Sequence, residues 1–449
     1  MKTKITFIAD THYFSPTLTD GGRAYELRSG SDQKCLLETG ALVDSAFDML
    51  SKSDTEAVII AGDVTDNGER ASHNEFREKL YALKNKKPVY LITATHDWCS
   101  DGRPHSYFGD EVKNDAPYMN ADELRDFYFD FGPKQAKSEF ITPEGVCSYT
   151  VDIGDEVRLL AINDDRNGNG RAGYLGEHLD WILGEIKKAK DEGKFLIGME
   201  HHLIMPHIHP LISAFGMQIG DSEKTATILA DAGLRYMFVG HSHIQRTSTL
   251  TTEKGNTITQ INVGSLVGYP GSIVNVTVEN GKLDYEINHT DTFTYNSKTE
   301  NTMEYLANHA LGIIDNVLNA AAGKDKKEFV DRLGALGIKS EKINKLHPII
   351  RPFAKKLMKM KVSNLYHIIN PITLGKLIDK KDAKEYWNTP VMDFVHEIFL
   401  SVFGSELASP KDEAYCNLVK GVVSLPAFYV RKNKVLKQLP QVIECLISA

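Results

Sequence analysis

The stretch Phe7-Ile8-Ala9-Asp10-Thr11-His12 lies near the start of the chain, where an apolar segment ends in a carboxylate and an imidazole two residues apart. Side chains alternate along an extended segment, so Asp10 and His12 are expected on the same face. An oxygen donor beside a nitrogen donor at a strand end is half of a site for a divalent transition metal. Taken alone, such a pair is more often a turn with a hydrogen-bonded histidine than a metal site, so the rest of the sequence must decide.

Four further apolar segments end in residues of the same kind. Residues 58–61 precede Gly62-Asp63, residues 89–92 precede Ala94-Thr95-His96-Asp97, residues 195–199 precede His201-His202, and residues 236–239 precede Gly240-His241-Ser242-His243. Each pattern predicts a buried strand followed by aspartate or histidine side chains that can bind a metal. In open α/β sheets, sites form outside the carboxyl ends of the strands, so five such ends can meet at one crevice. The pattern therefore predicts a metal site in an α/β fold.

In their order and spacing, these five blocks resemble the motif series of the calcineurin-like metallophosphoesterases, which reads D-x-H, G-D, G-N-H-[DE], H and G-H-x-H. The resemblance spans residues 10–243 and is greatest to cyclic-nucleotide phosphodiesterase-like members with an extra helical region. It implies two facing mixed β-sheets flanked by helices, an α/β/β/α sandwich. One block departs from the family pattern, because Ala94-Thr95-His96-Asp97 stands where the family has Gly-Asn-His-Asp.

The resemblance also implies two divalent cations, chosen among Mn, Fe, Zn and Co, and a hydroxide bridging them that attacks the phosphorus. One cation is assigned to Asp10, His12 and His243. The other is assigned to His201 and His241, with Asp63 as the bridging ligand. His201 is preferred over its neighbour His202 because it comes first after the strand, and His202 and His207 are read as supporting or surface residues.

The block at 94–97 carries the remaining catalytic assignments. By resemblance, His96 donates a proton to the leaving oxygen or holds a nonbridging oxygen, and Asp97 orients it. Thr95 occupies the place of an asparagine whose carbonyl contacts the second metal. A hydroxyl is a weaker donor than an amide oxygen, so the second metal is expected to bind less tightly.

Two polar loops, 13–34 and 98–120, supply candidate substrate contacts. Arg23 and Arg28 are within plausible reach of a phosphate, although a solvated surface arginine is the commoner case. For Trp98, stacking on a nucleobase and anchoring of the loop both stay open. For Tyr107 and Phe108, a hydrophobic anchor is the favoured interpretation.

Helical periodicity over 36–50, 71–83 and 175–189 predicts helices, and alternation over 247–263 and 272–288 predicts strands with a tight hairpin at Asn280-Gly281. From about residue 299 the pattern is helical throughout. We therefore expect a catalytic domain over 1–296 and an all-α domain over 297–449 that supplies no metal ligand.

Charge and composition limit the partners. Residues 1–295 carry a formal charge of −15 and residues 296–449 one of +7. An acidic catalytic part repels polyanions, so a small phosphate ester is expected as the substrate rather than long DNA or RNA. The chain has no apolar run of about 18 residues, which disfavours a membrane partner. Five scattered cysteines without C-x-x-C spacing indicate a reducing, cytoplasmic location, and the oligomeric state stays open.

Three functions are compatible with these residues. The leading hypothesis is a dimetal phosphodiesterase acting on a small ester such as a cyclic nucleotide. A phosphomonoesterase with the same centre is the runner-up. A phosphate- or nucleotide-binding module without hydrolysis is the third, because Thr95 departs from the family pattern.

Overall fold

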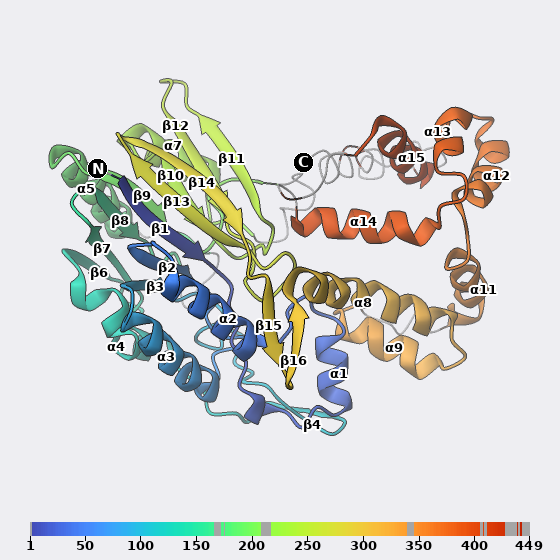
Figure 1. Ribbon diagram of the computed structural model, residues 1–449, viewed down its shortest axis with the longest axis horizontal. Coiled ribbons are helices and arrows are strands. Elements are labelled where there is room, and N and C mark those ends of the chain that lie inside the picture. Colours follow the sequence, from blue (N-terminus) through green and yellow to red (C-terminus); the bar gives the residue numbers. More distant parts are fainter. Residues whose placement is uncertain are drawn as a thin grey trace. The chain divides into compact units, whose positions relative to one another are not determined.

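The computed structural model describes residues 2–165, 172–174, 176–207, 217–338, 345–404, 407, 411–426, 438 and 441. Its contacts divide the chain into two compact units. Unit 1 comprises residues 1–29, 33–207 and 214–307, and unit 2 comprises residues 30–32, 208–213 and 308–449. Figure 1 labels the helices and strands of both units. No helix within the described ranges is long and apolar enough to cross a membrane.

The first sheet of unit 1 has five strands in the order β14-β13-β1-β2-β3. Strands β1 (Lys2–Ile8), β2 (Ala57–Ala61) and β3 (Val89–Ile92) are parallel, whereas β13 (Ile273–Glu279) and β14 (Lys282–Asn288) form an antiparallel hairpin beside β1. Asn280 and Gly281 between them both have positive φ, 53° and 71°, as a tight two-residue turn requires. The predicted hairpin is therefore confirmed. Every residue of β2 is buried, which suits an apolar strand in the middle of a covered sheet.

The second sheet has seven strands in the order β11-β12-β10-β9-β8-β7-β6. Its central strands β8, β9, β10 and β12 run parallel, and β6, β7 and β11 are antiparallel to their neighbours. The strands are β6 (Ser138–Ile141), β7 (Cys147–Ile153), β8 (Val157–Ala161), β9 (Phe195–Met199), β10 (Tyr236–Val239), β11 (Arg246–Thr251) and β12 (Thr257–Asn262). The carboxyl ends of β9 and β10 are thus neighbours.

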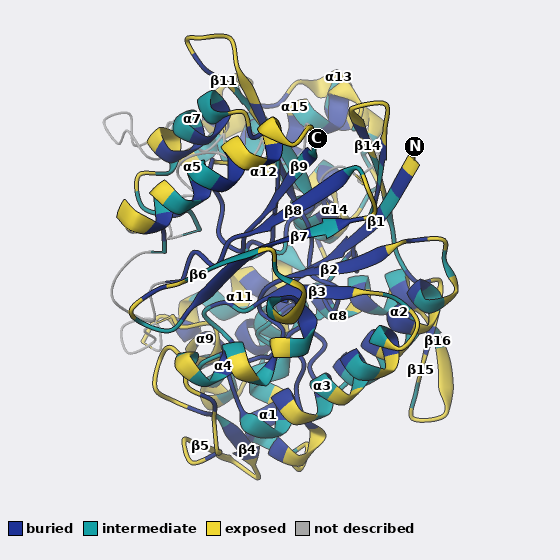
Figure 2. Cartoon of the chain, turned by 90° about the vertical axis from the view of Figure 1, so that its left-hand side faces the viewer, coloured by how far each residue is buried: buried dark blue, intermediate teal, exposed yellow. Residues whose placement is uncertain are grey.

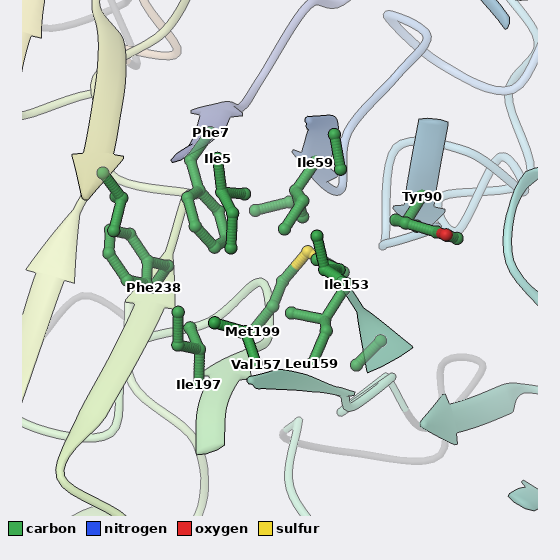
Figure 3. Packing of buried hydrophobic residues seen from close by; sticks show 14 of the residues in the cluster. Ile5, Phe7, Ile59, Tyr90, Ile153, Val157, Leu159, Ile197, Met199 and Phe238 are labelled. Atoms are coloured by element: carbon green, nitrogen blue, oxygen red, sulfur yellow. The ribbon is translucent and has the colours of Figure 1, made fainter. Parts of the chain in front are cut away.

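A hydrophobic core joins the inner faces of the two sheets (Figure 3). Phe7 of β1 stacks on Phe238 of β10 with ring centroids 3.8 Å apart and planes inclined by 5°. Ile59 and Met199 fill the space beside them, and each fully buried side chain of this size contributes about 1.5–3 kcal/mol. The packing fixes β1 against β10, and the candidate ligands follow directly after these strands.

Helices cover the outer faces of both sheets. Helices α2 (Thr39–Lys52) and α3 (Arg70–Lys84) share a core with the first sheet, and α5 (Gly176–Asp191) and α7 (Ser222–Ala232) share one with the second. In Figure 2 these helices are buried along one side and exposed along the other, as amphipathic periodicity predicts. The predicted α/β/β/α sandwich is confirmed.

The two polar loops contain more structure than the sequence indicates. Within 13–34 lies α1 (Arg23–Ser29), and within 98–120 lies a hairpin of β4 (Ser106–Phe108) and β5 (Glu111–Lys113). A small core that includes Phe14, Tyr25 and Tyr107 joins the two segments. Tyr107 is therefore a hydrophobic anchor, whereas Phe108 is exposed.

The boundary region contains a short hairpin of β15 (Thr292–Tyr295) and β16 (Lys298–Asn301). Residue 296, where the sequence analysis placed the boundary, lies in its turn. Phe293 and Leu306 pack into the core of unit 1, and the contacts divide between residues 307 and 308, inside α8 (Thr302–Ala322). The helices that follow are α9 (Lys326–Ala335), α11 (His347–Leu357), α12 (Val362–Thr373), α13 (Lys380–Glu385), α14 (Val391–Gly404) and α15 (Glu413–Val423).

Candidate metal centre

Backbone hydrogen bonds hold the strand ends against one another. The amide of Asp10 donates to the carbonyl of Gly62 at 3.2 Å, and the amide of His12 donates to the carbonyl of Asp63 at 3.0 Å. In the other sheet, the amide of Gly240 donates to the carbonyl of His201 at 3.0 Å. Between the two sheets, the amide of His241 donates to the carboxylate of Asp10 at 3.1 Å. The side chains after β1, β2, β9 and β10 therefore lie together, as the strand-end argument predicts.

Five of the six residues predicted as ligands have a left-handed backbone. Their φ values are 51° for Asp10, 37° for His12, 49° for Asp63, 69° for His241 and 59° for His243. Positive φ costs a residue with a Cβ roughly 1–2 kcal/mol. Such strain is retained where the fold requires a particular side-chain direction, and it clusters at functional sites.

Asp10, His12 and His243 form the first donor cluster, with one ligand atom of each within 4.8 Å of the others. The Nε2 atoms of His12 and His243 are 2.9 Å apart, and the Oδ1 atom of Asp10 lies 3.7 and 3.4 Å from them, respectively. Two imidazole nitrogens this close require a proton or a cation between them. Two nitrogens and one carboxylate oxygen suit Mn, Fe, Co or Zn, so these residues fit a divalent cation.

Asp63, His201 and His241 form the second cluster, again within 4.8 Å. The Nε2 atom of His201 is 3.0 Å from the Oδ2 atom of Asp63. The Nδ1 atom of His201 donates to the carbonyl of Ala61 at 2.8 Å, which leaves Nε2 as the nitrogen that faces Asp63 and the second cluster. The same Oδ2 atom of Asp63 lies 4.0 Å from the Nε2 atom of His12. One carboxylate oxygen therefore lies between the two clusters.

The electrostatics of these residues reflect their burial and their mutual contacts. Burial opposes ionisation of Asp10, but His243 and His12 outweigh it and hold the pKa of Asp10 below its usual range. Asp63 likewise has a lowered pKa, because the attraction of His201 and His96 exceeds the cost of burial. Burial, reinforced by the Lys34 charge, lowers the pKa of His12 to about 3. Burial opposes protonation of His201, but the Asp63 charge outweighs it and raises the pKa of His201 well above its usual range. Ionised carboxylates and a neutral His12 are the protonation states that a cation needs, and at the second cluster a cation would take the place of the His201 proton.

The structure places His96 beside the first cluster, with its ring centroid 5.0 Å from that of His12 and the two planes nearly perpendicular. Its Nδ1 atom donates to the backbone carbonyl of Asp66 at 2.5 Å. Its Nε2 atom is therefore the one left to face a substrate. The group that contacts this ring at Nδ1 is the Asp66 carbonyl, and the carboxylate of Asp97, predicted to orient His96, binds Thr65 and the amide of Ala94 instead.

The carboxylate of Asp97 holds the loop of residues 94–97 to the segment around Thr65 by hydrogen bonds. Its Oδ2 atom accepts from the amide of Ala94 at 2.8 Å, and its Oδ1 atom accepts from the amide and hydroxyl of Thr65 at 2.9 and 3.1 Å. Burial, with the nearby Asp63 charge, raises the pKa of Asp97 to about 8. Thr95 lies in the same loop, half-buried, and its hydroxyl forms no hydrogen bond with the part of the chain that the structure describes.

The predicted substrate contacts have partners within the protein. Arg23, the first residue of α1, pairs with Glu26 at 2.7 Å. The indole Nε1 of Trp98 donates to the carboxylate of Asp165, and the ring also packs against the core beneath the first sheet. These contacts hold the Trp98 ring in place and suit an anchor for the loop, and stacking on a nucleobase stays a prediction.

The two histidines read as supporting residues are both buried. The Nδ1 atom of His202 lies 3.2 Å from both carboxylate oxygens of Asp164, and its ring centroid is 4.4 Å from that of His241. The Nε2 atom of His207 lies 2.9 Å from the hydroxyl of Ser242, between His241 and His243. Both therefore support the loops that carry the second cluster.

Gln33 and Lys34 lie near the centre and were not indicated by the sequence, and Arg28 lies there with a contact that was not predicted. Gln33 contacts His243, and Lys34 and Arg28 both pair with Asp66, at 2.8 and 3.1 Å. Arg28 had been considered only as a contact for substrate. These residues lie in or beside long loops, whose paths periodicity does not predict; the strand-end rule locates only the residues that directly follow strands.

Comparisons with solved structures give low-identity neighbours. A dimetal phosphatase from Danio rerio is 10% identical, covering 67% of this chain and 99% of its own, with a TM-score of 0.45. A purple acid phosphatase from yellow lupin seeds is 13% identical, covering 67% and 53%, with a TM-score of 0.40. A putative 5'-nucleotidase from Staphylococcus aureus is 10% identical, covering 71% and 59%, with a TM-score of 0.37. A comparison with curated proteins gives no match.

The sequence itself matches a family model over residues 3–245, which is more than half of the 449 residues. That model describes the calcineurin-like phosphoesterases. The matched range contains both donor clusters and His96. The chain therefore belongs to the calcineurin-like phosphoesterase family, whose members are metal-dependent phosphoester hydrolases.

Proposed function

We propose that this protein is a dimetal phosphodiesterase that hydrolyses small phosphodiesters such as cyclic nucleotides. The observation that carries the proposal is the position of the Asp63 Oδ2 atom, 3.0 Å from the Nε2 atom of His201 and 4.0 Å from that of His12. A single oxygen between two separate donor clusters is the arrangement that a pair of cations needs.

In this proposal, Asp10, His12 and His243 would hold one divalent cation, His201 and His241 would hold the other, and Asp63 would be the ligand shared by both. The bound cations would supply an activated water nucleophile and neutralise charge on the phosphoryl group. The protein contributes fixed ligand directions. The His201 tautomer is set by the Ala61 carbonyl, and the amide of His241 donates to the carboxylate of Asp10 at 3.1 Å.

His96 is proposed as the proton donor to the leaving oxygen. Its Nδ1–H is occupied by the Asp66 carbonyl, so the imidazolium offers its Nε2–H to the substrate. The neighbouring segment is anchored because Lys34 and Arg28 both bind the carboxylate of Asp66. The His96 ring is thus held by the backbone carbonyl of Asp66, and the side chain of Asp66 is held by Lys34 and Arg28.

The charges near the centre support a diester over a monoester. Lys34 and Arg28 are both paired with Asp66, so their charges are partly neutralised before a substrate arrives. A monoester dianion needs more positive charge than a diester monoanion. The formal charge of −15 over residues 1–295 acts in the same direction and also disfavours long nucleic acids.

A cytoplasmic location is part of the proposal. Cys35, Cys99, Cys147 and Cys416 are free thiols, which suits a reducing compartment. Fractionation of the source cells with an antibody against the protein tests this assignment, and recovery in an oxidising compartment would contradict it.

The deciding experiment compares hydrolysis of bis-p-nitrophenyl phosphate, p-nitrophenyl phosphate and cyclic AMP by the purified protein with and without Mn²⁺. We expect kcat/KM for the diester to exceed that for the monoester, with both rates depending on added metal. Asp63→Asn is the control for contaminating hydrolases. A higher kcat/KM for the monoester would establish a phosphomonoesterase. Binding of Mn²⁺ and phosphate without turnover of any ester would establish a binding module.

A further inference from the structure

Gln33 reaches the metal centre from a loop far away in the sequence. Its Nε2 atom lies 2.6 Å from the Nδ1 atom of His243, 210 positions along the chain. The other ring nitrogen of His243 faces the first cluster, 2.9 Å from the Nε2 atom of His12 and 3.4 Å from the Oδ1 atom of Asp10. The amide of Gln33 therefore contacts the candidate ligand His243 at the ring nitrogen that faces away from the first cluster.

The Gln33 amide is buried, and within the described part of the chain only one of its two polar atoms has a hydrogen-bond partner. The residue is 7% exposed, and its Oε1 atom has no hydrogen-bond partner among the residues that the structure describes. With Nε2 donating to Nδ1, the proton of a neutral His243 lies on Nε2, which is the nitrogen aimed at Asp10 and His12. With the amide turned by 180°, Oε1 accepts from Nδ1–H, and the Nε2 atom of His243 presents a lone pair. Each orientation leaves one amide atom unpaired, so the tautomer of His243 decides between them.

The fold holds Gln33 in reach of His243 in either orientation. The amide of the nearby Cys35 donates to the carbonyl of Val267 at 2.9 Å, which fixes the segment against the loop after β12. On the next residue, Gly268, a Cβ atom would lie 2.5 Å from the Oε1 atom of Gln33, so the glycine leaves room for the amide in its present position. Lys34, which follows Gln33, is tied to Asp66.

We propose that Gln33 is a positioning residue for His243. Its amide oxygen accepts the Nδ1 proton and so fixes the tautomer in which Nε2 binds a cation. This inference rests on the proposed function, because it assigns a cation to the first cluster. A neutral amide can do this without adding a third negative charge to a site that already contains Asp10 and Asp63. Groups that support metal-bound histidines typically change metal affinity by about 10- to 100-fold.

The test uses the full-length protein after removal of metal, titrated with Co²⁺ by calorimetry and visible absorption. Gln33→Met keeps the length of the side chain but has no acceptor, and Gln33→Glu keeps an acceptor. We expect Gln33→Met to weaken the tighter Co²⁺ site by about 10- to 100-fold, and Gln33→Glu, which keeps an acceptor and adds a negative charge, to bind Co²⁺ as tightly as wild type or more tightly. Gln260→Met is the matched control, because Gln260 is a buried glutamine whose Oε1 atom accepts from the amides of Ile204 and Met205. It is expected to lower stability without changing Co²⁺ affinity.

A second readout follows the tautomer directly. In the Zn²⁺-loaded wild type, imidazole ¹⁵N shifts are expected to show a protonated Nδ1 on His243, and Gln33→Met is expected to broaden or shift that signal. Unchanged Co²⁺ affinity in Gln33→Met would overturn the inference while leaving the proposed function intact. Equal weakening in Gln33→Met and Gln33→Glu would also overturn it, in favour of a packing role. Failure of the wild type to bind any divalent cation would overturn both proposals.

Discussion

At the scale of single residues, His96 has one nitrogen committed to the protein and one directed toward substrate. His96→Ala is expected to lower kcat for an ester with a poor leaving group by about 10²- to 10⁴-fold, because a positioned proton donor is lost. The metal content should not change, since His96 belongs to neither donor cluster. Steady-state kinetics and metal analysis of the same preparation check this prediction. Full activity on such a substrate would show that the assigned role is wrong.

Thr95 gives a prediction about the second cation. Its hydroxyl lies in a loop that Asp97 holds in place, and it is a poorer ligand than the amide oxygen found there in the family. Titration of the metal-free protein with Mn²⁺ is expected to show a tight phase and a weak phase, with activity following the weak one. Thr95→Asn should tighten the weak phase by about 10- to 100-fold. Two sites with equal Mn²⁺ affinity, unchanged by Thr95→Asn, would contradict this prediction.

Glu69 gives a prediction about pH and stability. Burial, with the charge of Asp66, raises the pKa of Glu69 to about 8. An unfolded glutamate ionises near pH 4.3, so between about pH 4.3 and 8 the folded state keeps a proton that the unfolded state releases. The free energy of unfolding therefore falls as pH rises through this window, by at most about 1.4 kcal/mol per pH unit from this group.

Glu69→Gln removes that ionisation and should gain stability relative to wild type as pH increases. Urea unfolding of both proteins at pH 5, 6.5 and 8 measures the difference. A difference that stays constant with pH would show that the carboxyl ionises normally.

The sequence predicted the candidate ligands because each directly follows an apolar strand, and the carboxyl ends of neighbouring strands must lie together. The sequence did not predict the groups that hold these histidines in place. The carbonyl of Asp66 and the amide of Gln33 reach His96 and His243 across long loops, and a backbone carbonyl leaves no signal in residue type. The proximity of Asp97 to His96 in the sequence likewise does not tell which atom contacts the ring, and the carboxylate binds Thr65 and Ala94.

At the scale of elements, the end of β2 depends on Gly62. Its φ is +83°, and a Cβ atom there would lie 2.6 Å from the Nδ1 atom of His201. Gly62→Ala is expected to reduce stability by more than the roughly 1–2 kcal/mol cost of the left-handed backbone, and to weaken binding at the second cluster by displacing His201.

Gly193→Ala is the matched control for this change. Its φ is +68°, but nothing lies within 4 Å of the added Cβ, so it carries the backbone cost without the clash. Urea unfolding and Co²⁺ titration of both variants separate the two effects. Equal losses of stability, with normal metal binding in Gly62→Ala, would contradict the role given to the close approach.

The elements also show where periodicity succeeds. Predicted helices at 36–50, 71–83 and 175–189 correspond to α2, α3 and α5 with ends shifted by a few residues, because one face of each packs on a sheet. Helix α1 and the β4–β5 hairpin were missed. Both are short and are stabilised by the small core that includes Phe14, Tyr25 and Tyr107, which joins segments distant in sequence.

At the scale of the whole molecule, metal binding and folding stability should be linked. The two clusters combine residues from both sheets, so only the folded protein presents them together. Mn²⁺ at 100 times its dissociation constant is expected to raise the free energy of unfolding by about 2.7 kcal/mol per site. Asp63→Asn, which weakens the oxygen shared between the clusters, should lose most of this gain and abolish hydrolysis. Urea unfolding with and without Mn²⁺ checks the prediction. Equal stabilisation of the variant by Mn²⁺ would exclude Asp63 as a shared ligand.

The position of β1 in the middle of the first sheet has a consequence for synthesis of the chain on the ribosome. One neighbour of β1, strand β2, is made soon afterwards, but the other, β13, ends at Glu279. Translation proceeds at about 5–20 residues per second, so the first strand waits roughly 15–55 s for its second partner. During that time one edge of β1 has no hydrogen-bonding neighbour. The first donor cluster waits almost as long, because Asp10 emerges more than 230 residues before His243. The first donor cluster can therefore bind a cation only after residue 243 has been synthesised, when more than half of the chain has been made.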